Sequence, residues 1–324
     1  MTVVAIAGGT GDLGRTIVEA IAKTGKHTVY VLSRNADATH PIAAVAKLVA
    51  LDYGSPSQIS DVLQQLHVET VISTLNLNWP GSPQAQLNLI QGAAQSGVVK
   101  RFIPSEFNID YNVSEDRMPY PPRIDQLKAI QELEQYPQLT YTLIRNGNFM
   151  DYLGLPFADT FLKPLYMVVD LPAAEAAIPG DGTAMVTFTH TTDVGKFVAA
   201  LLDVPASRWP LESTVIGEKI VLNDLISLAE KVTGQQFKKT FDSLERLRKM
   251  ETTELPSNRP SYPFFPGGKA ELDMVVSTMM VGMATGVFDI SGTNLQTLAP
   301  DIETMKIEPF LKTCWAKAQK QETG

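Results

Sequence analysis

The chain has 324 residues, a net charge of −8, and hydrophobic and charged fractions of 44% and 19%. This length allows one large domain with an elaboration or two smaller ones, and no apolar run reaches the roughly 20 residues that a membrane-spanning helix needs. The acidic balance excludes a nucleic-acid backbone as the main partner, because such proteins concentrate Lys and Arg on one face.

The first half of the chain alternates short β-branched runs with longer helical patterns, which predicts a parallel sheet with crossover helices. Gly25 and Gly97 end helices in this series. We therefore predict an α/β fold with a Rossmann-type doubly wound sheet. The expected elements are strand Val3–Ala7, helix Leu13–Lys23, strand His27–Leu32, strand Lys47–Leu51, helix Ser57–Gln65, strand Glu69–Ser73, helix Gln84–Gln95, strand Lys100–Pro104, helix Ile124–Glu134 and a sixth strand, Thr140–Arg145.

Beyond the sixth strand the regular alternation ends. Residues 149–182 are rich in Pro and aromatic side chains, which is typical of a segment that covers a site. Residues 186–202 resume a strand-then-helix pattern, and residues 223–234 predict a helix with Asn223 as its cap and Gly234 as its stop. Residues 274–288 predict a buried helix, and residues 302–319 a partly helical tail.

A glycine-rich loop joins the first strand to the first helix and fits G-x-G-x-x-G in its required context. Glycine suits a turn with positive φ, backbone N–H groups close to a pyrophosphate, and tight packing of helix on strand. The N-terminus of the helix adds the positive end of its dipole. A ligand-free turn is the alternative, and Asp12 is expected to face solvent or cap the helix. The expected cofactor contacts are Gly8, Thr10, Gly11, Asp12, Leu13 and Gly14.

Arg34 follows the second strand, where NAD-binding proteins usually place an acid. A guanidinium there favours the 2′-phosphate of NADP, so NADP(H) is the expected cofactor. A solvated arginine at a strand end is the alternative. The ends of strands three and four add Asp52, Ser73, Thr74 and Leu75 at the same carboxyl edge, with ordinary loop chemistry as their alternative.

These features predict an NADP(H)-binding domain over residues 1–149, with a return at about 185–205. A smaller, interleaved substrate lobe takes most of residues 150–324. In that lobe, aromatic and aliphatic side chains are expected to line an apolar pocket, with core packing as the alternative. They are Tyr152, Leu155, Phe157, Phe161, Tyr166, Tyr262, Phe264 and Phe265. Residues 274–283 are likewise expected either to line the pocket or to pack in the core.

The residue patterns of several common catalytic and metal sites are absent from the sequence. No tyrosine has a lysine four positions later, no G-x-S-x-G is present, and the four histidines, His27, His40, His67 and His190, have no paired spacing for a metal. The lone Cys314 forms no internal disulfide, and the first residues lack the charged region of a secretory signal. We expect a cytoplasmic protein without a metal site or a membrane partner, a monomer or a homodimer.

An ordered series of motifs runs along the chain: residues 8–14, 71–74, Gln86, 100–107 (KRFIPSEF), Lys128, 141–145, Asn148 with Phe149, 178–182, 193–195 and 300–302. In these residues the chain resembles the NmrA-like and isoflavone reductase-like branch of atypical short-chain dehydrogenases. One departure is Asn108, because a glycine usually follows the Pro-Ser-Glu-Phe run in the reductases of this branch.

The resemblance implies that Lys128 is catalytic and contacts the cofactor, with a surface lysine paired with Glu132 as the alternative. It also implies that Phe149, next to Asn148, lies beside the nicotinamide, and that Ser105, Glu106 and Phe107 form the floor near strand five. Core packing is the alternative for these residues.

Three functions remain open from the sequence. The first is an NADPH-dependent reductase of specialised metabolism, acting on a small apolar carbonyl, imine or enone of aromatic, terpenoid or polyketide type. The second is a non-catalytic, NADP-sensing regulator with a protein partner. A scaffold with a vestigial nucleotide fold is the third. Lys128 favours the enzyme, and the intact glycine loop with Arg34 disfavours the scaffold.

Overall fold

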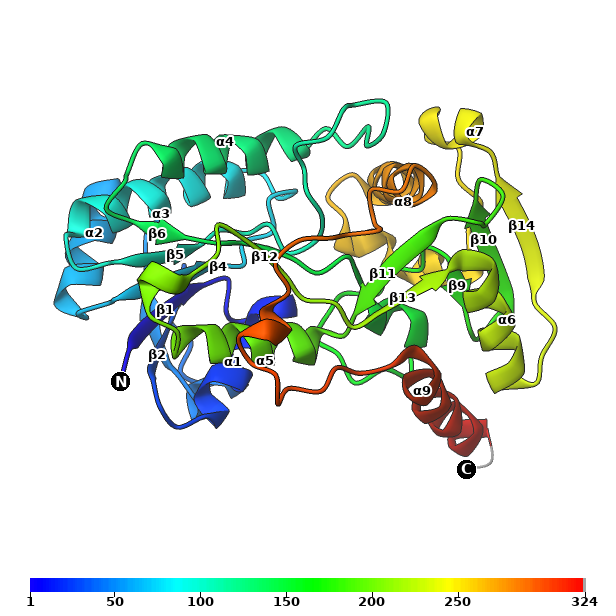
Figure 1. Cartoon of the computed structure of the whole chain (residues 1–324), viewed down its shortest axis with the longest axis horizontal. Coiled ribbons are helices and arrows are strands. Elements are labelled where there is room, and N and C mark those ends of the chain that lie inside the picture. The colour runs from blue at the N-terminus through cyan, green and yellow to red at the C-terminus, as the bar shows by residue number, and fades with distance from the viewer. Residues whose placement is uncertain (323–324) are drawn as a thin grey trace.

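The computed structural model describes residues 1–322, and side chains up to residue 320. Its centre is a six-stranded parallel sheet in the order β3-β2-β1-β4-β5-β6 (Figure 1). This is the strand order of a doubly wound Rossmann sheet, and the order reverses direction between β1 and β4. The predicted fold class is confirmed. The strands are β1 (Val3–Ala7), β2 (Thr28–Ser33), β3 (Lys47–Ala50), β4 (Thr70–Ser73), β5 (Arg101–Ile103) and β6 (Thr140–Tyr141).

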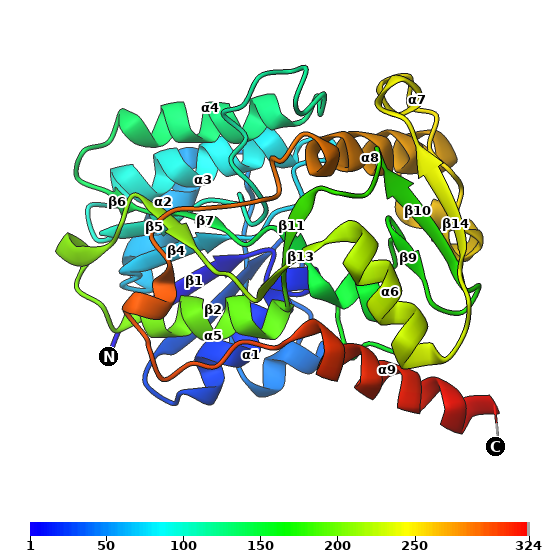
Figure 2. The ribbon, with the colours of Figure 1, turned by 45° about the vertical axis from the view of Figure 1, so that its right-hand side comes forward.

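Helices cover both faces of this sheet, which explains why its strands read as nearly continuous apolar runs. On one face lie α1 (Asp12–Lys23) and α5 (Thr191–Leu202), and on the other α2 (Pro56–Gln65), α3 (Ser82–Ser96) and α4 (Arg123–Glu134), as Figures 1 and 2 show. Each face has its own apolar core. Gly97 caps the end of α3 in the left-handed conformation, with φ of 68°, as the sequence predicts.

Two sequence predictions are wrong, one at the last strand of this sheet and one at a helix later in the chain. The expected strand over residues 140–145 is two strands, because the backbone N–H of Thr142 donates to Phe102 but that of Leu143 donates to Leu211. The second piece, β7 (Leu143–Arg145), therefore leaves the sheet and pairs with β12 (Glu212–Thr214). Asn223 does not cap its helix, since α6 (Leu222–Thr233) begins one residue earlier and the Asn223 amide donates to the carbonyl of Asp181 at 3.0 Å.

The rest of the chain builds a second lobe beside the sheet from two three-stranded sheets and helices (Figure 1). One sheet has the order β14-β10-β9 and the other β13-β11-β8. The domain boundary expected near residue 149 stays a prediction. The strands are β8 (Asn148–Phe149), β9 (Val169–Asp170), β10 (Glu175–Pro179), β11 (Met185–Thr189), β13 (Glu218–Val221) and β14 (Lys238–Asp242), and the helices besides α6 are α7 (Leu244–Arg248), α8 (Gly268–Ala284) and α9 (Ile307–Glu322).

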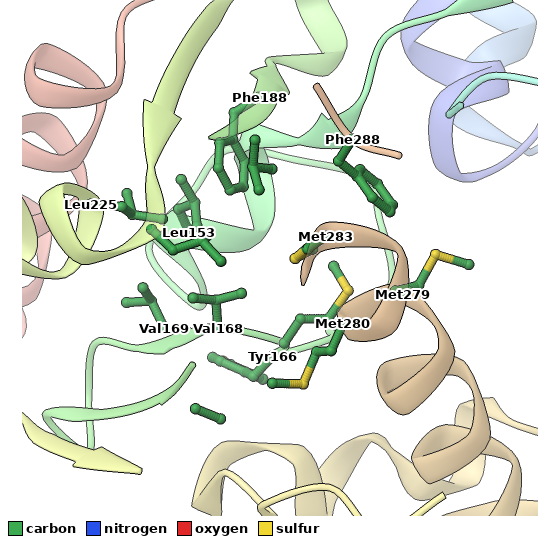
Figure 3. Close-up of a cluster of buried hydrophobic side chains, with 14 of the residues drawn as sticks. Leu153, Tyr166, Val168, Val169, Phe188, Leu225, Met279, Met280, Met283 and Phe288 are labelled. Atoms are coloured by element: carbon green, nitrogen blue, oxygen red, sulfur yellow. The ribbon is translucent and has the colours of Figure 1, made fainter. Parts of the chain in front are cut away.

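The core of this lobe forms around α8, whose residues from Val275 to Met283 are all buried. Figure 3 shows Met280 and Met283 of α8 near Tyr166, in a cluster that also holds Phe188 of β11. The predicted buried helix is thus present, although it begins six residues earlier and ends at Ala284. No helix among the described residues is long and apolar enough to cross a membrane.

Phe188 and Phe241 provide a test of where the stability of this lobe comes from. Phe188 is fully buried, whereas Phe241 on β14 is 51% exposed. We expect Phe188→Ala to lower the free energy of unfolding by about 3–5 kcal/mol, because it removes a large side chain and leaves a cavity. Phe241→Ala should change it by less than about 0.5 kcal/mol. Urea titrations of both variants measure this difference, and equal losses would contradict the assigned core.

Candidate active site

A cavity of about 270 Å³ opens at the carboxyl ends of β1, β4 and β5. This is the point where the strand order reverses, which is where open α/β sheets bind their ligands. The start of α1, the loops after β4 and β5, β8, and segments of the second lobe all contribute to its wall. The cavity is therefore shared by the sheet and the lobe.

Half of the expected cofactor contacts line this cavity, and the other half lie around or outside it. Those that line it are Asp12, Leu13, Thr74, Leu75, Ser105, Phe107, Asn148 and Phe149. Those outside the lining are Gly8, Thr10, Gly11, Gly14, Arg34, Asp52, Ser73 and Lys128.

The glycine loop is held tightly against the end of β4. Gly8 has a φ of +80°, and a Cβ at this position would lie 2.8 Å from the carbonyl oxygen of Thr74. A Cβ on Gly14 would collide with the carbonyl of Gly8. Thr74 adds a hydrogen bond between the ends of β4 and β1, because its hydroxyl donates to the carbonyl of Ala7 at 2.8 Å. We call this contact between the two strand ends the joint. Only glycine allows this approach of the two strand ends.

The N-terminus of α1 faces open space beside this joint. Gly11 is the residue before the helix, no side chain caps it, and a Cβ built on it would meet no atom within 4 Å. The first N–H groups of the helix therefore lack side-chain partners, and an approaching anion would meet no side chain at Gly11. These features fit the pyrophosphate of a dinucleotide.

Asp12 behaves differently from the sequence expectation, because it neither faces bulk solvent nor caps α1. Its carboxylate lines the cavity and accepts a hydrogen bond from the backbone N–H of Lys163 at 3.3 Å. Burial raises the pKa of Asp12, and Lys163 partly opposes the shift. The segment around Lys163 is thereby tied to the glycine loop, a contact between residues 151 positions apart.

Three other expected cofactor residues lie at the ends of β2, β3 and β4. Arg34 is exposed just beyond β2 and lies close enough to Tyr53 to affect the pKa of its hydroxyl, which burial raises and Arg34 lowers. Asp52 is exposed and accepts from the N–H of Gly54 at 2.9 Å. The buried hydroxyl of Ser73 has no partner in the described structure.

The loop after β5 is fixed by a residue of α3. Gln86, which is 1% exposed, accepts from the backbone N–H of Ser105 at 2.9 Å, and the Ser105 hydroxyl donates to the carbonyl of Leu75 at 2.9 Å. Phe149, on β8, packs edge-on against Tyr152 with ring centres 6.2 Å apart. The residues that the sequence expects at the floor are thus held next to the loop after β4.

Lys128 does not enter the cavity. Its side chain is 54% exposed, and its ammonium pairs with Asp125 of the same helix at 3.2 Å. This geometry matches the alternative of a surface lysine, but its partner is Asp125 and not the expected Glu132. Glu132 instead accepts hydrogen bonds from Gln91 and Tyr136. A catalytic role for Lys128 stays a prediction that rests on the resemblance alone.

Glu106 is a buried carboxyl group in the wall of the cavity, 3% exposed. Burial raises its pKa to about 8, and Arg145, whose Nε lies 3.8 Å from Oε1, opposes the shift. Arg145 already pairs with Asp110 and Glu212 at 3.2 and 3.1 Å. Neither oxygen of Glu106 has a hydrogen-bond partner, so the neutral carboxylic acid is favoured at pH 7.

The apolar wall of the cavity differs from the expected set. Tyr152, Phe264 and Phe265 line it as expected. The other members do not: Leu155 and Tyr166 belong to the lobe core, Phe157 and Tyr262 pack against that core, and Phe161 lies under the guanidinium of Arg15 at 3.8 Å. Wall residues that the sequence pattern did not single out are Leu77, Asn78, Trp79, Tyr111, Tyr120, Gln126, Leu162, Lys163, Leu165, Met167, Pro266 and Glu271.

In the part of the chain that the structure describes, no three His, Cys, Asp or Glu side chains gather as they would to hold a metal ion. The cavity lies beside a glycine loop and offers an apolar wall and polar groups.

The NmrA-like family model matches residues 1–273 of the chain. The oxidoreductase swnN of Metarhizium robertsii is 38% identical over 341 aligned positions, covering 99% of both chains. The phenylcoumaran benzylic ether reductase TP7 of Nicotiana tabacum is 28% identical and covers 78% of this chain and 82% of its own. A leucoanthocyanidin reductase from Vitis vinifera, solved as a ternary complex, has the same fold with a TM-score of 0.71 at 19% identity, over 98% and 99% of the two chains.

The raised pKa of Glu106 predicts a pH dependence of stability. The native state holds a proton on this group that the unfolded chain releases near pH 4.5, so the free energy of unfolding should fall as pH rises from 4.5 to about 8. The contribution to the slope is at most about 1.4 kcal/mol per pH unit. Glu106→Gln cannot ionise and should lack this contribution.

Urea titrations between pH 5 and 9 measure the effect, with the exposed Glu115→Gln as control. The stability of Glu106→Gln relative to the unaltered protein should increase over this window, and that of the control should not. Parallel pH profiles for all three proteins would show that Glu106 is ionised in the folded state.

Proposed function

This chain belongs to the NmrA-like family and is an oxidoreductase of its isoflavone reductase-like branch, and on that premise we propose that it is an NADPH-dependent reductase of a small, largely apolar substrate in specialised metabolism. The observation that carries the proposal is the position of the cavity. It lies beside a glycine loop that fits a pyrophosphate, with Asp12 and Leu13 of that loop in its wall, and extends to an apolar wall built by a different part of the chain.

The cofactor part of the proposal rests on the loop and the strand ends. The uncapped N–H groups of α1 and the loop around Gly8 and Gly11 would hold the pyrophosphate. Arg34, beyond β2, would bind the 2′-phosphate of the adenosine ribose, with Asp52 and Ser73 near the adenosine half. When bound, NADPH would supply a hydride from the nicotinamide ring, near Phe149 and Asn148.

The substrate part rests on the opposite wall. Residues of α8, such as Val275 and Met279, and the pair Phe264 and Phe265 present apolar surface to the cavity. The wall therefore favours a compact apolar body over a sugar or a phosphorylated metabolite. One solved protein of the same fold is a complex with NADP⁺ and (+)-pinoresinol, an association that supports a dinucleotide together with a small organic ligand.

The function is tested first by binding. Trp79 lines the cavity and is 40% exposed, so tryptophan fluorescence should report the titration of NADPH, NADP⁺ and NADH. Turnover is then measured as NADPH oxidation with two bicyclic aromatic probes, the ketone 1-tetralone and the imine 3,4-dihydroisoquinoline. Turnover of either probe supports a reductase, whereas NADPH binding without turnover of either favours the sensing regulator. Failure to bind any dinucleotide would refute both.

We predict that Arg34→Ala weakens NADPH binding by about tenfold or more, because a charge-assisted hydrogen bond to the 2′-phosphate is worth about 1.5–3 kcal/mol. NADH lacks that phosphate, so its affinity should not change. Fluorescence titration of both cofactors checks this, with the exposed Arg208→Ala as control. An equal loss for NADPH and NADH would assign Arg34 a structural role.

Lys128→Ala is expected to retain kcat within about threefold, because the ammonium pairs with Asp125 outside the cavity. Lys249→Ala is the matched control, since Lys249 directly follows α7, is also exposed and pairs with Glu245 of that helix at 2.8 Å. Steady-state NADPH oxidation with the two probes measures both. A general acid typically contributes 10²–10⁴-fold, so a loss of that size in Lys128→Ala alone would establish the role that the resemblance implies.

A further inference from the structure

The cavity wall formed by the loop after β5 and by α4 carries hydrogen-bond acceptors without donors. The side-chain oxygens of Asn108 and Gln126 are buried and have no partner in the described structure, and both residues line the cavity. A buried amide oxygen without a donor costs free energy, which a ligand that supplies the donor recovers. These two oxygens therefore indicate what the cavity is built to receive.

The orientation of the Asn108 amide is set by its neighbours. Its Nδ2 lies 3.7 Å from the sulfur of Met279 on α8, which also lines the cavity. The nitrogen of the amide is engaged and its oxygen is left free.

The charges around the cavity favour a cation. Among the described residues that line it, Asp12 and Glu271 carry carboxylates, Glu106 carries a carboxyl group that is neutral at pH 7, and Lys163 is the one cationic side chain. The Lys163 ammonium lies 5.3 Å from the ring centre of Trp79. Glu271 sits in the first turn of α8, and one of its oxygens accepts from the N–H of Gly267 at 2.6 Å, which fixes the carboxylate at the wall.

The proton donors of this wall are the neutral carboxyl group of Glu106 and buried phenols. Burial raises the pKa of Tyr111, Tyr120 and Tyr152, which makes these phenols weaker acids than in water. The Tyr120 hydroxyl already donates to Asn78 at 2.5 Å. Reduction of a ketone creates an alkoxide that needs a proton, and with Lys128 outside the cavity that proton would have to come from Glu106.

On the premise that this chain is an NADPH-dependent reductase, we propose that its substrate is a protonated imine whose N–H⁺ donates to the Asn108 oxygen, with Gln126 and Glu271 adding negative potential. Hydride addition forms a C–H bond at the imine carbon, and the C=N π electrons become the lone pair of a neutral amine. The reduced nicotinamide dinucleotide is oxidised by two electrons. No further proton enters, so the reaction draws a proton neither from Glu106 nor from the phenols.

Binding tests this without relying on turnover. The protein saturated with NADP⁺ is titrated calorimetrically with 1,2,3,4-tetrahydroisoquinoline, the amine product of the imine probe, and with 1-tetralone. We expect the amine, which is cationic at neutral pH, to bind at least tenfold more tightly than the ketone. In turnover, kcat/KM for 3,4-dihydroisoquinoline should exceed that for 1-tetralone by the same factor, and N-methylation of the imine, which keeps the charge but removes the N–H, should lower it.

Two variants of Asn108 predict opposite changes. Asn108→Leu removes the acceptor and should weaken amine binding about tenfold, whereas Asn108→Asp adds a charge and should strengthen it. Binding of 1-tetralone should not follow this order, and NADPH affinity should stay unchanged in both. Asn112→Leu, at an exposed asparagine outside the cavity, is the matched control.

The outcomes separate this inference from the proposed function. If NADPH binds and 1-tetralone is bound or reduced as well as its nitrogen analogues, the inference is overturned while the reductase stands. Equal loss of amine affinity in Asn108→Leu and Asn108→Asp overturns it as well, because that pattern indicates a structural role. If NADPH itself does not bind, the proposed function has failed. Opposite shifts in the two variants support the protonated imine.

Discussion

The close contact between the carboxyl ends of β1 and β4 is the constraint on which the site depends. Gly8 lies against the carbonyl of Thr74, and Thr74 in turn bonds to the carbonyl of Ala7. This joint fixes where the chain leaves β1 and where α1 begins. Because α1 begins without a side-chain cap, its N-terminal N–H groups remain available at the mouth of the cavity. A larger residue at Gly8 or Gly14 would separate the strand ends and displace the helix.

The second lobe completes a cavity that the sheet alone would leave open. Its core is organised by α8, and side chains from the same helix reach the cavity at Val275 and Met279. The hydrogen bond from the backbone N–H of Lys163 to the Asp12 carboxylate links the lobe to the glycine loop. Stability of the lobe and shape of the substrate wall are therefore coupled through one helix, so a substitution that repacks α8 alters both.

The polar groups of the cavity differ from the Tyr/Lys pair of common short-chain dehydrogenases. The phenols here are buried with raised pKa values, the neutral carboxyl group is that of Glu106, and the amide oxygens of Asn108 and Gln126 lack a donor. An environment rich in acceptors stabilises a substrate that brings its own proton. The proposed imine substrate rests on these unpartnered amide oxygens and on the carboxylates of Asp12 and Glu271 in the same cavity wall.

Local sequence patterns determined the sheet, its crossover helices and the glycine loop, because each depends on residues adjacent in the chain: apolar runs, helix stops such as Gly97, and the spacing from Gly8 to Gly14. The resemblance added the loop after β5, whose Ser105 and Phe107 do line the cavity. Tertiary structure alone decided the rest. Strand partners changed at Leu143, Lys128 faced solvent while Gln126 two residues earlier faced the cavity, and aromatic residues divided between core and wall. These outcomes depend on contacts between segments distant in sequence, and an apolar or amide side chain has the same sequence signature whether it meets a neighbour or a ligand.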